Sequence, residues 1–468
     1  MRIHRVLIKE FKNLRDFNCV FSGSNTAAFI GNNGSGKSNL LEVITRAFSN
    51  AQNMACSKSL PLIYPGAKPE VRECVIEYSV RNVSYTLLYN CGIIELPLTS
   101  EPDSWPEIRE TVEIWNGNKK LSKSEFPNAL PETVMIYYAG ETQRQRGIAE
   151  TTYDTFYERR LIRAKTSDLP GLRFIDYYNT ADLTLLLAAA SAYRGSYYHE
   201  LLELLDCNQI APKFSVILRR PQKGKGAADT YWGATGFVKH FLDDLRKYVS
   251  ATRDSGTQYF MFFDNADVLK RISADELDLF AKLKVLKYYG YLDHIGIEFI
   301  KQNGSHFSSL RLSEGEKQLS LLHLLLSFSA DKKCLYIFDE FDAYLHPGWQ
   351  RHFVNMMRTI DFDGQLIFTT HSPLSLTKMD KEEIKVLVNG DIYEPNRDTY
   401  NRDVSDVLTE LMDVSRRPKD VEEVIKKFKQ AVYFKKKEKA MLYYKELQAI
   451  ISQDDPFLLQ AAVLMEDL

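Results

Sequence analysis

A glycine-rich segment near the N-terminus limits what this chain can fold into more than any other part of the sequence. It fits the pattern G-x-x-x-x-G-K-S/T, follows an apolar run that ends at Ile30, and precedes an apolar-periodic stretch from Leu40 to Phe48. A strand, a glycine loop and a helix in this order begin an α/β nucleotide-binding core. The glycines let backbone N–H groups turn towards phosphates, and the helix N-terminus adds partial positive charge. After Gly31, the residues predicted to contact the nucleotide are Asn32, Asn33, Gly34, Ser35, Gly36, Lys37, Ser38 and Asn39.

Two side chains of this loop carry the expected chemistry. Lys37 is predicted to neutralise the β- and γ-phosphates, and Ser38 to offer its hydroxyl group to a magnesium ion. The alternative interpretation is a chance glycine-rich turn, which the flanking strand and helix disfavour. The sequence therefore predicts ATP and magnesium as cofactors.

A second motif is an apolar strand at 335–338 that ends in the carboxylates of Asp339 and Glu340. A buried parallel strand that ends in acids places them at the carboxyl edge of the sheet, where ligands bind. Asp339 suits the magnesium shell, and Glu340 suits the activation of the attacking water. Without the phosphate loop, two solvated carboxylates at a strand end would explain this motif equally well.

Two further segments complete the set. Ser313, Gly315 and Glu316 open a strongly apolar helix and would form a second helix N-terminus suited to phosphate, although a simple N-cap is the commoner use of such residues. His371 follows the apolar run 366–368, where a lone histidine is usually only a polar loop residue. The order of these segments around Asp339 favours the functional interpretation.

The four motifs, in this order, resemble the ATPase heads of the SMC/RecF/OLD group within the ABC superfamily. The segments 8–14 and 339–347 also resemble that group, and the resemblance covers roughly residues 1–50 and 305–375. It implies that Ser313, Gly315 and Glu316 form the signature that closes on the ATP of a second copy, in a head-to-tail dimer or a larger homo-oligomer. It implies that His371 is the switch histidine, and that a glutamine lies between the lobes: Gln143, with Gln145 as the alternative.

The expected fold is an α/β, ABC-type P-loop ATPase head with an antiparallel β subdomain and a helical insert. A hairpin is predicted at 71–89 and a buried strand at 134–138. A capping box of Ser273 and Glu276 is expected to open the last helix of the insert. The predicted domains are a first ATPase lobe at 1–145, the insert at 146–300, a second lobe at 301–395 and a helical region at 396–468.

Composition and charge limit the ligands and the cell compartment that we expect for this protein. Net charge is −2 from 60 basic and 62 acidic side chains, so the bulk charge does not indicate DNA binding. The six cysteines lack metal-ligand spacing and are read as reduced thiols. The N-terminus does not resemble a signal peptide, and the longest apolar run, 185–190, is too short to span a bilayer. We therefore expect a cytoplasmic protein with no membrane contact.

The resemblance also suggests a biological role. Short, insert-bearing ATPases of this branch are similar to subunits of bacterial anti-phage defence systems, the PARIS ATPase subunit first and the Septu ATPase next. This implies a separately encoded nuclease effector of the Toprim or HNH type and a phage-encoded trigger protein. The segment after the last core strand is too short for a Toprim domain, so we expect no nuclease activity in this chain. The alternative is a DNA-repair ATPase that binds DNA ends through the basic loop 219–225 or the lysines 435–437.

Overall fold

The computed structural model describes residues 1–56, 73–94, 107–140, 144–151, 155–395, 398–400 and 417–466, together with residues 402, 404 and 407. The chain divides into two compact units, Met1–Tyr400 and Asn401–Leu468. The boundary lies a few residues after the one expected at 396. The candidate site lies in the first unit.

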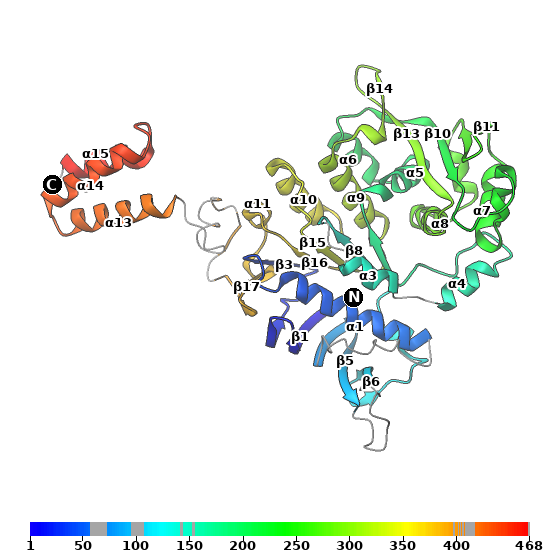
Figure 1. Cartoon of the computed structure of the whole chain (residues 1–468), viewed down its shortest axis with the longest axis horizontal. Coiled ribbons are helices and arrows are strands. Elements are labelled where there is room, and N and C mark those ends of the chain that lie inside the picture. Colours follow the sequence, from blue (N-terminus) through cyan, green and yellow to red (C-terminus); the bar gives the residue numbers. More distant parts are fainter. Residues whose placement is uncertain are drawn as a thin grey trace, which may run out of the picture. The chain divides into compact units, whose positions relative to one another are not determined.

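A seven-stranded sheet forms the centre of the first unit, in the order β18-β17-β3-β16-β15-β8-β9 (Figure 1). All neighbours are parallel except β17 and β18. Every residue of the three middle strands is buried, because helices cover a parallel sheet on both faces and its strands are apolar throughout. The strands are β3 (Thr26–Gly31), β8 (Val134–Tyr138), β9 (Ile175–Tyr178), β15 (Leu335–Asp339), β16 (Gln365–Thr369), β17 (Ile384–Val388) and β18 (Asp391–Tyr393).

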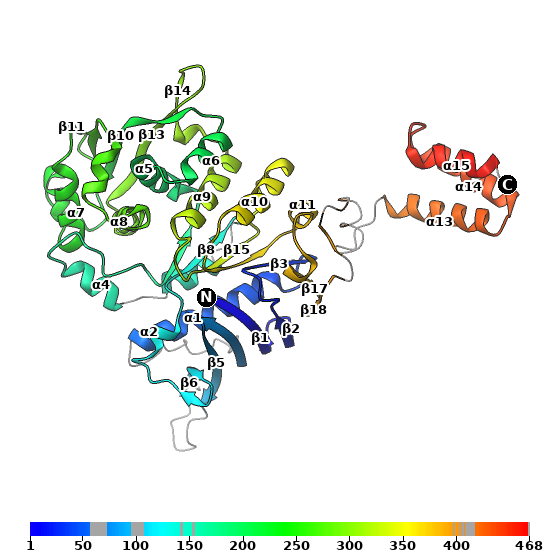
Figure 2. The ribbon, with the colours of Figure 1, turned by 180° about the vertical axis from the view of Figure 1, so that it is seen from behind.

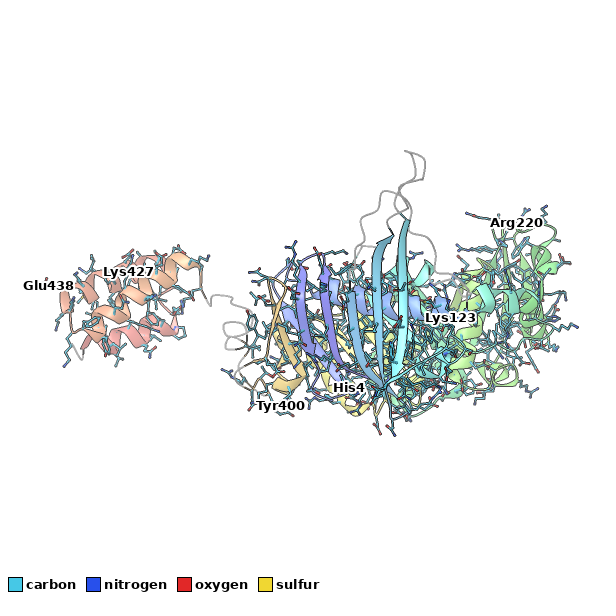
Figure 3. The ribbon with its side chains drawn as sticks, turned by 90° about the horizontal axis from the view of Figure 1, so that it is seen from below. His4, Lys123, Arg220, Tyr400, Lys427 and Glu438 are labelled. Atoms are coloured by element: carbon cyan, nitrogen blue, oxygen red, sulfur yellow. The ribbon has the colours of Figure 1, made fainter. Side chains whose placement is uncertain are left out.

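A six-stranded antiparallel sheet, in the order β2-β1-β4-β5-β6-β7, forms the expected β subdomain, and Figure 3 shows its strands side by side. The predicted hairpin is confirmed over the described strands, since Val80 pairs with Val83 and the turn residues Arg81 and Asn82 both have positive φ. The strands are β1 (Arg2–Phe11), β2 (Leu14–Val20), β4 (Glu73–Val80), β5 (Val83–Ile94), β6 (Glu107–Asn116) and β7 (Lys119–Lys120).

Helix α1 (Lys37–Cys56) packs between these two sheets (Figures 1 and 2). Its buried apolar side chains, including Leu40, Leu41 and Ile44, join the core that both sheets share. This packing fixes the start of α1 directly behind the carboxyl end of β3. The other helices near this sheet are α2 (Phe126–Ala129), α9 (Glu314–Phe328), α10 (Pro347–Thr359) and α11 (Pro373–Leu376).

The insert is not purely helical, which corrects the expectation for residues 146–300. Besides its helices it contains a five-stranded antiparallel sheet in the order β11-β12-β10-β13-β14. The prediction of a helical insert missed β12, whose run of aromatic residues favours a strand. The helices are α3 (Arg144–Thr151), α4 (Thr155–Ile162), α5 (Leu183–Tyr193), α6 (Tyr197–Leu204), α7 (Gly236–Arg246) and α8 (Glu276–Tyr288). The strands are β10 (Gln209–Arg219), β11 (Ala251–Asp254), β12 (Gln258–Phe263), β13 (Leu292–Ile300) and β14 (His306–Ser308).

The predicted capping box at the last insert helix is also wrong. Helix α8 begins at Glu276, and its N-cap is Asp275, whose carboxylate accepts a hydrogen bond from the backbone N–H of Asp278 at 2.7 Å. Ser273 instead donates to the carbonyl oxygen of Leu269 at 2.7 Å. An ionised carboxylate is a stronger acceptor for the N–H groups of a first turn than a hydroxyl group, and this sequence offers both.

Residues 417–466 of the second unit form three helices, α13 (Lys419–Tyr433), α14 (Lys437–Ile450) and α15 (Pro456–Glu466). Its small core includes Phe428, Ala440 and Leu447, all fully buried. None of the helices in the described part of the chain is both long and apolar enough to cross a membrane. The described residues also contain no group of three or more His, Cys, Asp and Glu side chains suited to a metal ion.

Candidate functional site

The predicted phosphate loop connects the end of β3 to the start of α1. Gly31, Gly34 and Gly36 all have positive φ, which a residue with a side chain rarely adopts. A Cβ atom at Gly31 would lie 2.2 Å from the carbonyl oxygen of Leu387, and one at Gly36 would lie 2.8 Å from the side chain of Leu14. Both glycines are therefore required by the close approach of neighbouring strands as well as by the turn.

Lys37 is held inside this loop. Its ammonium group donates to the carbonyl oxygens of Gly31 at 2.7 Å and Asn32 at 3.2 Å, and the residue is buried. Burial lowers the pKa of Lys37, while the carboxylates of Asp339 and Glu340 oppose this shift. A cationic donor held inside a glycine loop suits an anionic ligand, to which Lys37 would donate in place of these carbonyl oxygens.

Asp339 contacts Ser38 across the site. The Ser38 hydroxyl group donates to the Asp339 carboxylate at 3.2 Å, although 301 residues separate the two. Burial raises the pKa of Asp339 to about 6, against the opposing effect of hydrogen bonds from Thr369 and Ser38. A hydroxyl and a carboxylate oxygen are hard ligands of the kind that Mg²⁺ prefers, and a divalent cation would favour the ionised carboxylate. The residues therefore fit the expected magnesium ion.

Glu340 has a backbone conformation that is rare outside glycine, with a φ of 50°. Its N–H donates to the hydroxyl group of Thr369 at 2.8 Å, and the same hydroxyl group donates to Asp339 at 2.5 Å. Thr369 therefore fixes both acids, and strain at this position is of the kind found at functional sites. The sequence analysis missed Thr369. Its only signal is its place at the end of β16, beside β15, which requires the strand order to be known.

His371 follows β16 and lies at the same edge of the sheet. Desolvation lowers the pKa of His371, the charge of Lys37 lowers it further, and the charge of Glu340 raises it. The neutral form of the imidazole is therefore favoured. The turn that presents it is fixed by Thr370, which accepts a hydrogen bond from the N–H of Ser372 at 2.8 Å.

Asn13, in the turn between β1 and β2, supports the phosphate loop from outside. Its side-chain amide donates to the carbonyl oxygen of Gly34 at 2.9 Å and accepts from Asn39 at 2.7 Å. Asn39, predicted to contact the nucleotide, therefore bonds to Asn13 in this structure. Asn13 belongs to the segment that resembles the first strand of the family, but no local pattern around it indicates a role.

The expected glutamine between the lobes is only partly accessible to a structural test, because Gln143 lies outside the described residues. Gln145 is buried on α3, and both polar atoms of its side-chain amide lack a hydrogen-bond partner among the described residues. Burying an amide without hydrogen-bond partners costs free energy. Gln145 is therefore notable as the alternative candidate for the glutamine between the lobes.

The predicted signature segment opens α9. The hydroxyl group of Ser313 accepts from the N–H of Glu316 at 3.3 Å, and the Glu316 carboxylate accepts from the N–H of Ser313 at 2.7 Å, which is a capping box. Gly315 packs against Trp349, where an added Cβ would lie 2.9 Å from the indole ring. Within the described chain, no hydrogen bond or ion pair joins 313–316 to the phosphate loop. Ser313 is exposed, and its hydrogen bonds are those that it exchanges with Glu316 in the cap.

Curated proteins that are similar to this chain include two retron ATPases. The chain is 24% identical to the retron Vc95 probable ATPase of Vibrio cholerae serotype O1 biovar El Tor, over 92% of this chain and 84% of that protein. It is 22% identical to the retron Ec83 probable ATPase of Escherichia coli, over 93% of this chain and 81% of that protein.

The chain is also similar, at low sequence identity, to two solved structures. The SMC head domain from Thermotoga maritima shares 14% identity with a TM-score of 0.35, over 84% of this chain and 98% of that one. The recombination mediator protein RecF shares 16% with a TM-score of 0.33, over the same 84% of this chain and 98% of that one. The model of the RecF/RecN/SMC N-terminal domain matches residues 2–392, most of the sequence, and this chain belongs to that family.

Proposed function

We propose that this protein binds ATP with magnesium and hydrolyses it slowly, as a switch. One observation carries the proposal: Lys37, Ser38 and Asp339 come together at one edge of the sheet from segments about three hundred residues apart. Lys37 would hold the phosphates, Ser38 and Asp339 would hold the magnesium ion, and Glu340 would take the proton of the attacking water. His371 would contact the γ-phosphate.

The complete site is proposed to include a second copy of the chain. Ser313, Gly315 and Glu316 open a helix whose N-terminus carries partial positive charge, and Ser313 is exposed. In a head-to-tail dimer this terminus would supply donors to the γ-phosphate held by the partner's loop. ATP would then favour the closed dimer, and hydrolysis would release it.

The biological role that we propose is a subunit of a bacterial anti-phage defence system. Both curated relatives carry the description of a retron ATPase, and each aligns with more than nine tenths of this chain. The ATPase would hold, and then release or activate, a separately encoded nuclease of the Toprim or HNH type in response to a phage protein. The resemblance to the PARIS and Septu ATPase subunits is compatible with this role.

A docking surface for the nuclease is proposed on the second unit. Leu459 and Val463 are 63% and 60% exposed and lie four residues apart, on one face of α15. Leu442 on α14 is also 62% exposed. Exposed aliphatic side chains at helical spacing are typical of a surface that binds a partner protein.

Affinity purification of the tagged chain, expressed together with the nuclease encoded beside it, tests this role. Recovery of the nuclease, and its loss in Leu459→Ser/Val463→Ser but not in the control Tyr393→Ala, is the expected result. The DNA-repair alternative instead predicts ATP-dependent binding of duplex DNA ends with no associated nuclease. Recovery of the chain alone, with tight binding to duplex ends, would favour that alternative.

A further inference from the structure

One stretch of the second unit concentrates positive charge, although residues 401–468 together contain 12 basic and 13 acidic side chains. Between Val424 and Lys445 the sequence contains eight lysines and one acid, Glu438, although acidic and basic residues nearly balance over the chain. All eight lysines are exposed, and among the described residues none takes part in an ion pair. Figure 3 marks Lys427 on α13 and Glu438 near the start of α14. Such a surface attracts polyanions.

Two aromatic side chains protrude from the same surface. Tyr433 is 81% exposed and Phe434 is 64% exposed, which makes them the two most exposed of the large hydrophobic side chains described. Their rings lie edge to face, with centroids 5.2 Å apart. Exposing a large apolar ring to water is unfavourable unless a partner covers it. A partner for this surface should therefore contact both the two exposed rings and the lysines beside them.

The turn between α13 and α14 holds these rings in place. The N–H of Phe434 donates to Gln430, that of Lys435 to Val432 and that of Lys436 to Ala431, at 2.8–3.0 Å. Lys435 adopts the left-handed conformation with a φ of 52°, which ends α13 directly after the rings. The Lys436 ammonium group lies 5.7 Å from the centre of the Phe434 ring. The aromatic residues are therefore presented by a hydrogen-bonded turn with a cation beside them.

Two lysines of α13, Lys426 and Lys429, lie on the same side as Tyr433, whereas Lys427 lies on another side and the acid Glu422 precedes Lys426 by one turn in the same row. Lys426, Lys429 and Tyr433 are three and four residues apart, which places them in one row along the helix. The buried residues Val424, Phe428 and Ala431 form the opposite face. The row of cations thus leads to the aromatic turn, where Lys435, Lys436 and Lys437 continue it.

We propose that this turn binds single-stranded nucleic acid, with bases stacked on Tyr433 and Phe434 and phosphates bound by the surrounding lysines. Protruding rings flanked by cations are suited to unpaired bases, whose faces are free, whereas the bases of a duplex are already stacked. An acidic protein partner would use the lysines but would leave the aromatic faces without a specific role. The proposal does not depend on ATP hydrolysis by the first unit.

Fluorescence anisotropy with the full-length protein tests the proposal, using a labelled thymidine strand of about 20 nucleotides, longer than the span of a typical single-strand binding module. The expected result is binding of the strand and weaker binding of a duplex of equal length. Tyr433→Ala/Phe434→Ala should weaken strand binding roughly thirtyfold or more, since each lost stack removes about fivefold or more. Replacing Lys435, Lys436 and Lys437 by Gln should reduce the salt dependence, log Kd against log salt, by about 2.

Matched variants make the result decisive. Tyr393→Ala removes a tyrosine that is 54% exposed in the first unit, and should leave strand binding unchanged. Lys223→Gln/Lys225→Gln alters the other basic loop, beside Arg220 at the outer edge of the insert (Figure 3), and should also have no effect. Unchanged ATP hydrolysis in the Tyr433/Phe434 variant shows that the first unit is intact.

Several results would overturn the proposal. They are absence of strand binding by the unaltered protein, equal binding of the duplex, and unchanged binding when both rings are removed. Loss of strand binding in Lys223→Gln/Lys225→Gln would place the nucleic-acid surface on the insert. A change of sedimentation coefficient in the Tyr433/Phe434 variant would show that the rings join two copies of the chain. None of these results bears on the proposed ATPase site, which Lys37 tests separately.

Discussion

The parallel sheet and the antiparallel sheet of the insert differ in what their sequences reveal. In the parallel sheet, β3, β15 and β16 are buried throughout, and polar residues follow directly at their carboxyl ends. In the insert, β10 alternates irregularly between buried and exposed residues, and β11 is exposed throughout. In a sequence, an apolar run that ends abruptly in polar residues indicates the ligand-binding edge of a parallel sheet. A strand with one solvent-exposed face has a pattern that is easily mistaken for an amphipathic helix or a loop. We therefore expect substitutions at the edge of the parallel sheet to change ATP binding or hydrolysis. Substitutions in the insert should change stability or docking instead.

The largest effect is expected for Lys37→Ala. Removing the buried ammonium group should abolish measurable ATP binding, because it removes the main counter-charge to the phosphates, and each hydrogen bond from a charged donor contributes about 1.5–3 kcal/mol. Isothermal titration calorimetry checks this, with Lys223→Ala in the insert as the control. Normal ATP affinity in Lys37→Ala would disprove the phosphate-loop assignment.

Glu340→Gln should retain ATP binding and lose hydrolysis by roughly 10²–10⁴-fold, the usual contribution of a general base. The contacts of the loop remain, so ATP should hold the closed dimer for longer, and light scattering should detect a larger or longer-lived assembly. Glu298→Gln, on β13 of the insert, is the matched control. Hydrolysis at the normal rate by Glu340→Gln would exclude this residue as the base.

Ser313→Arg should reduce hydrolysis by about 10²–10³-fold, as the loss of one transition-state donor does, while ATP binding persists. Mixing this variant with Lys37→Ala should restore part of the activity, because a heterodimer contains one site with an intact loop and an intact Ser313. Steady-state phosphate release measures both effects. Full activity of Ser313→Arg alone would favour a site within one chain.

Thr369→Val tests a residue that only the structure identified. The hydroxyl group bonds to Asp339 and to the backbone of Glu340, so its loss should lower hydrolysis by roughly tenfold through misplacement of both acids. ATP affinity should change less, since Lys37 is untouched. Thr252→Val on the exposed strand β11 is the control, and equal effects in the two variants would remove the special role of Thr369.

Asp182→Asn should have the smallest effect on ATP and a clear effect on stability. Burial raises the pKa of Asp182, but Lys284 and Lys287 outweigh burial, and the pKa lies below its ordinary value of 3.8. The Lys287 ammonium group lies 2.7 Å away, and breaking such a buried pair costs about 3–5 kcal/mol. The exposed pair of Asp267 and Lys270, at 3.4 Å, should cost at most about 1 kcal/mol in Asp267→Asn.

The sign of the pH dependence follows from this shift. Because the pKa of Asp182 is lower in the folded state, its stabilisation is present above the unfolded value of 3.8 and is lost as pH falls through the folded value. The difference in urea stability between Asp182→Asn and the unaltered protein should therefore be constant from pH 5 to 8 and decrease below about pH 4. A difference that disappears near neutral pH would exclude Asp182 as the cause.

The phosphate loop and the acid pair could be predicted because their signals are local. Gly31 to Ser38 need a strand before them and a helix after them, and Asp339 and Glu340 need only an apolar strand before them. The insert sheet could not be predicted, since β10, β12 and β13 pair across long stretches of chain and the helical segments between them dominate the pattern. The roles of Ser313 and His371 remain predictions, because their spacing and surroundings alone do not show what they bind.

The amino-acid order alone established the glycine loop, the lysine within it and the two carboxylates, since each depends on residues next to one another. The folded chain added Thr369 as the shared support of both acids, Asn13 as the support of Gly34, and the strained backbone of Glu340. The physical reason is strand order: β16 lies between β3 and β15, so the end of each strand meets side chains from segments far away in sequence. Such neighbours leave no periodic or local trace, and only packing of the sheet brings them together.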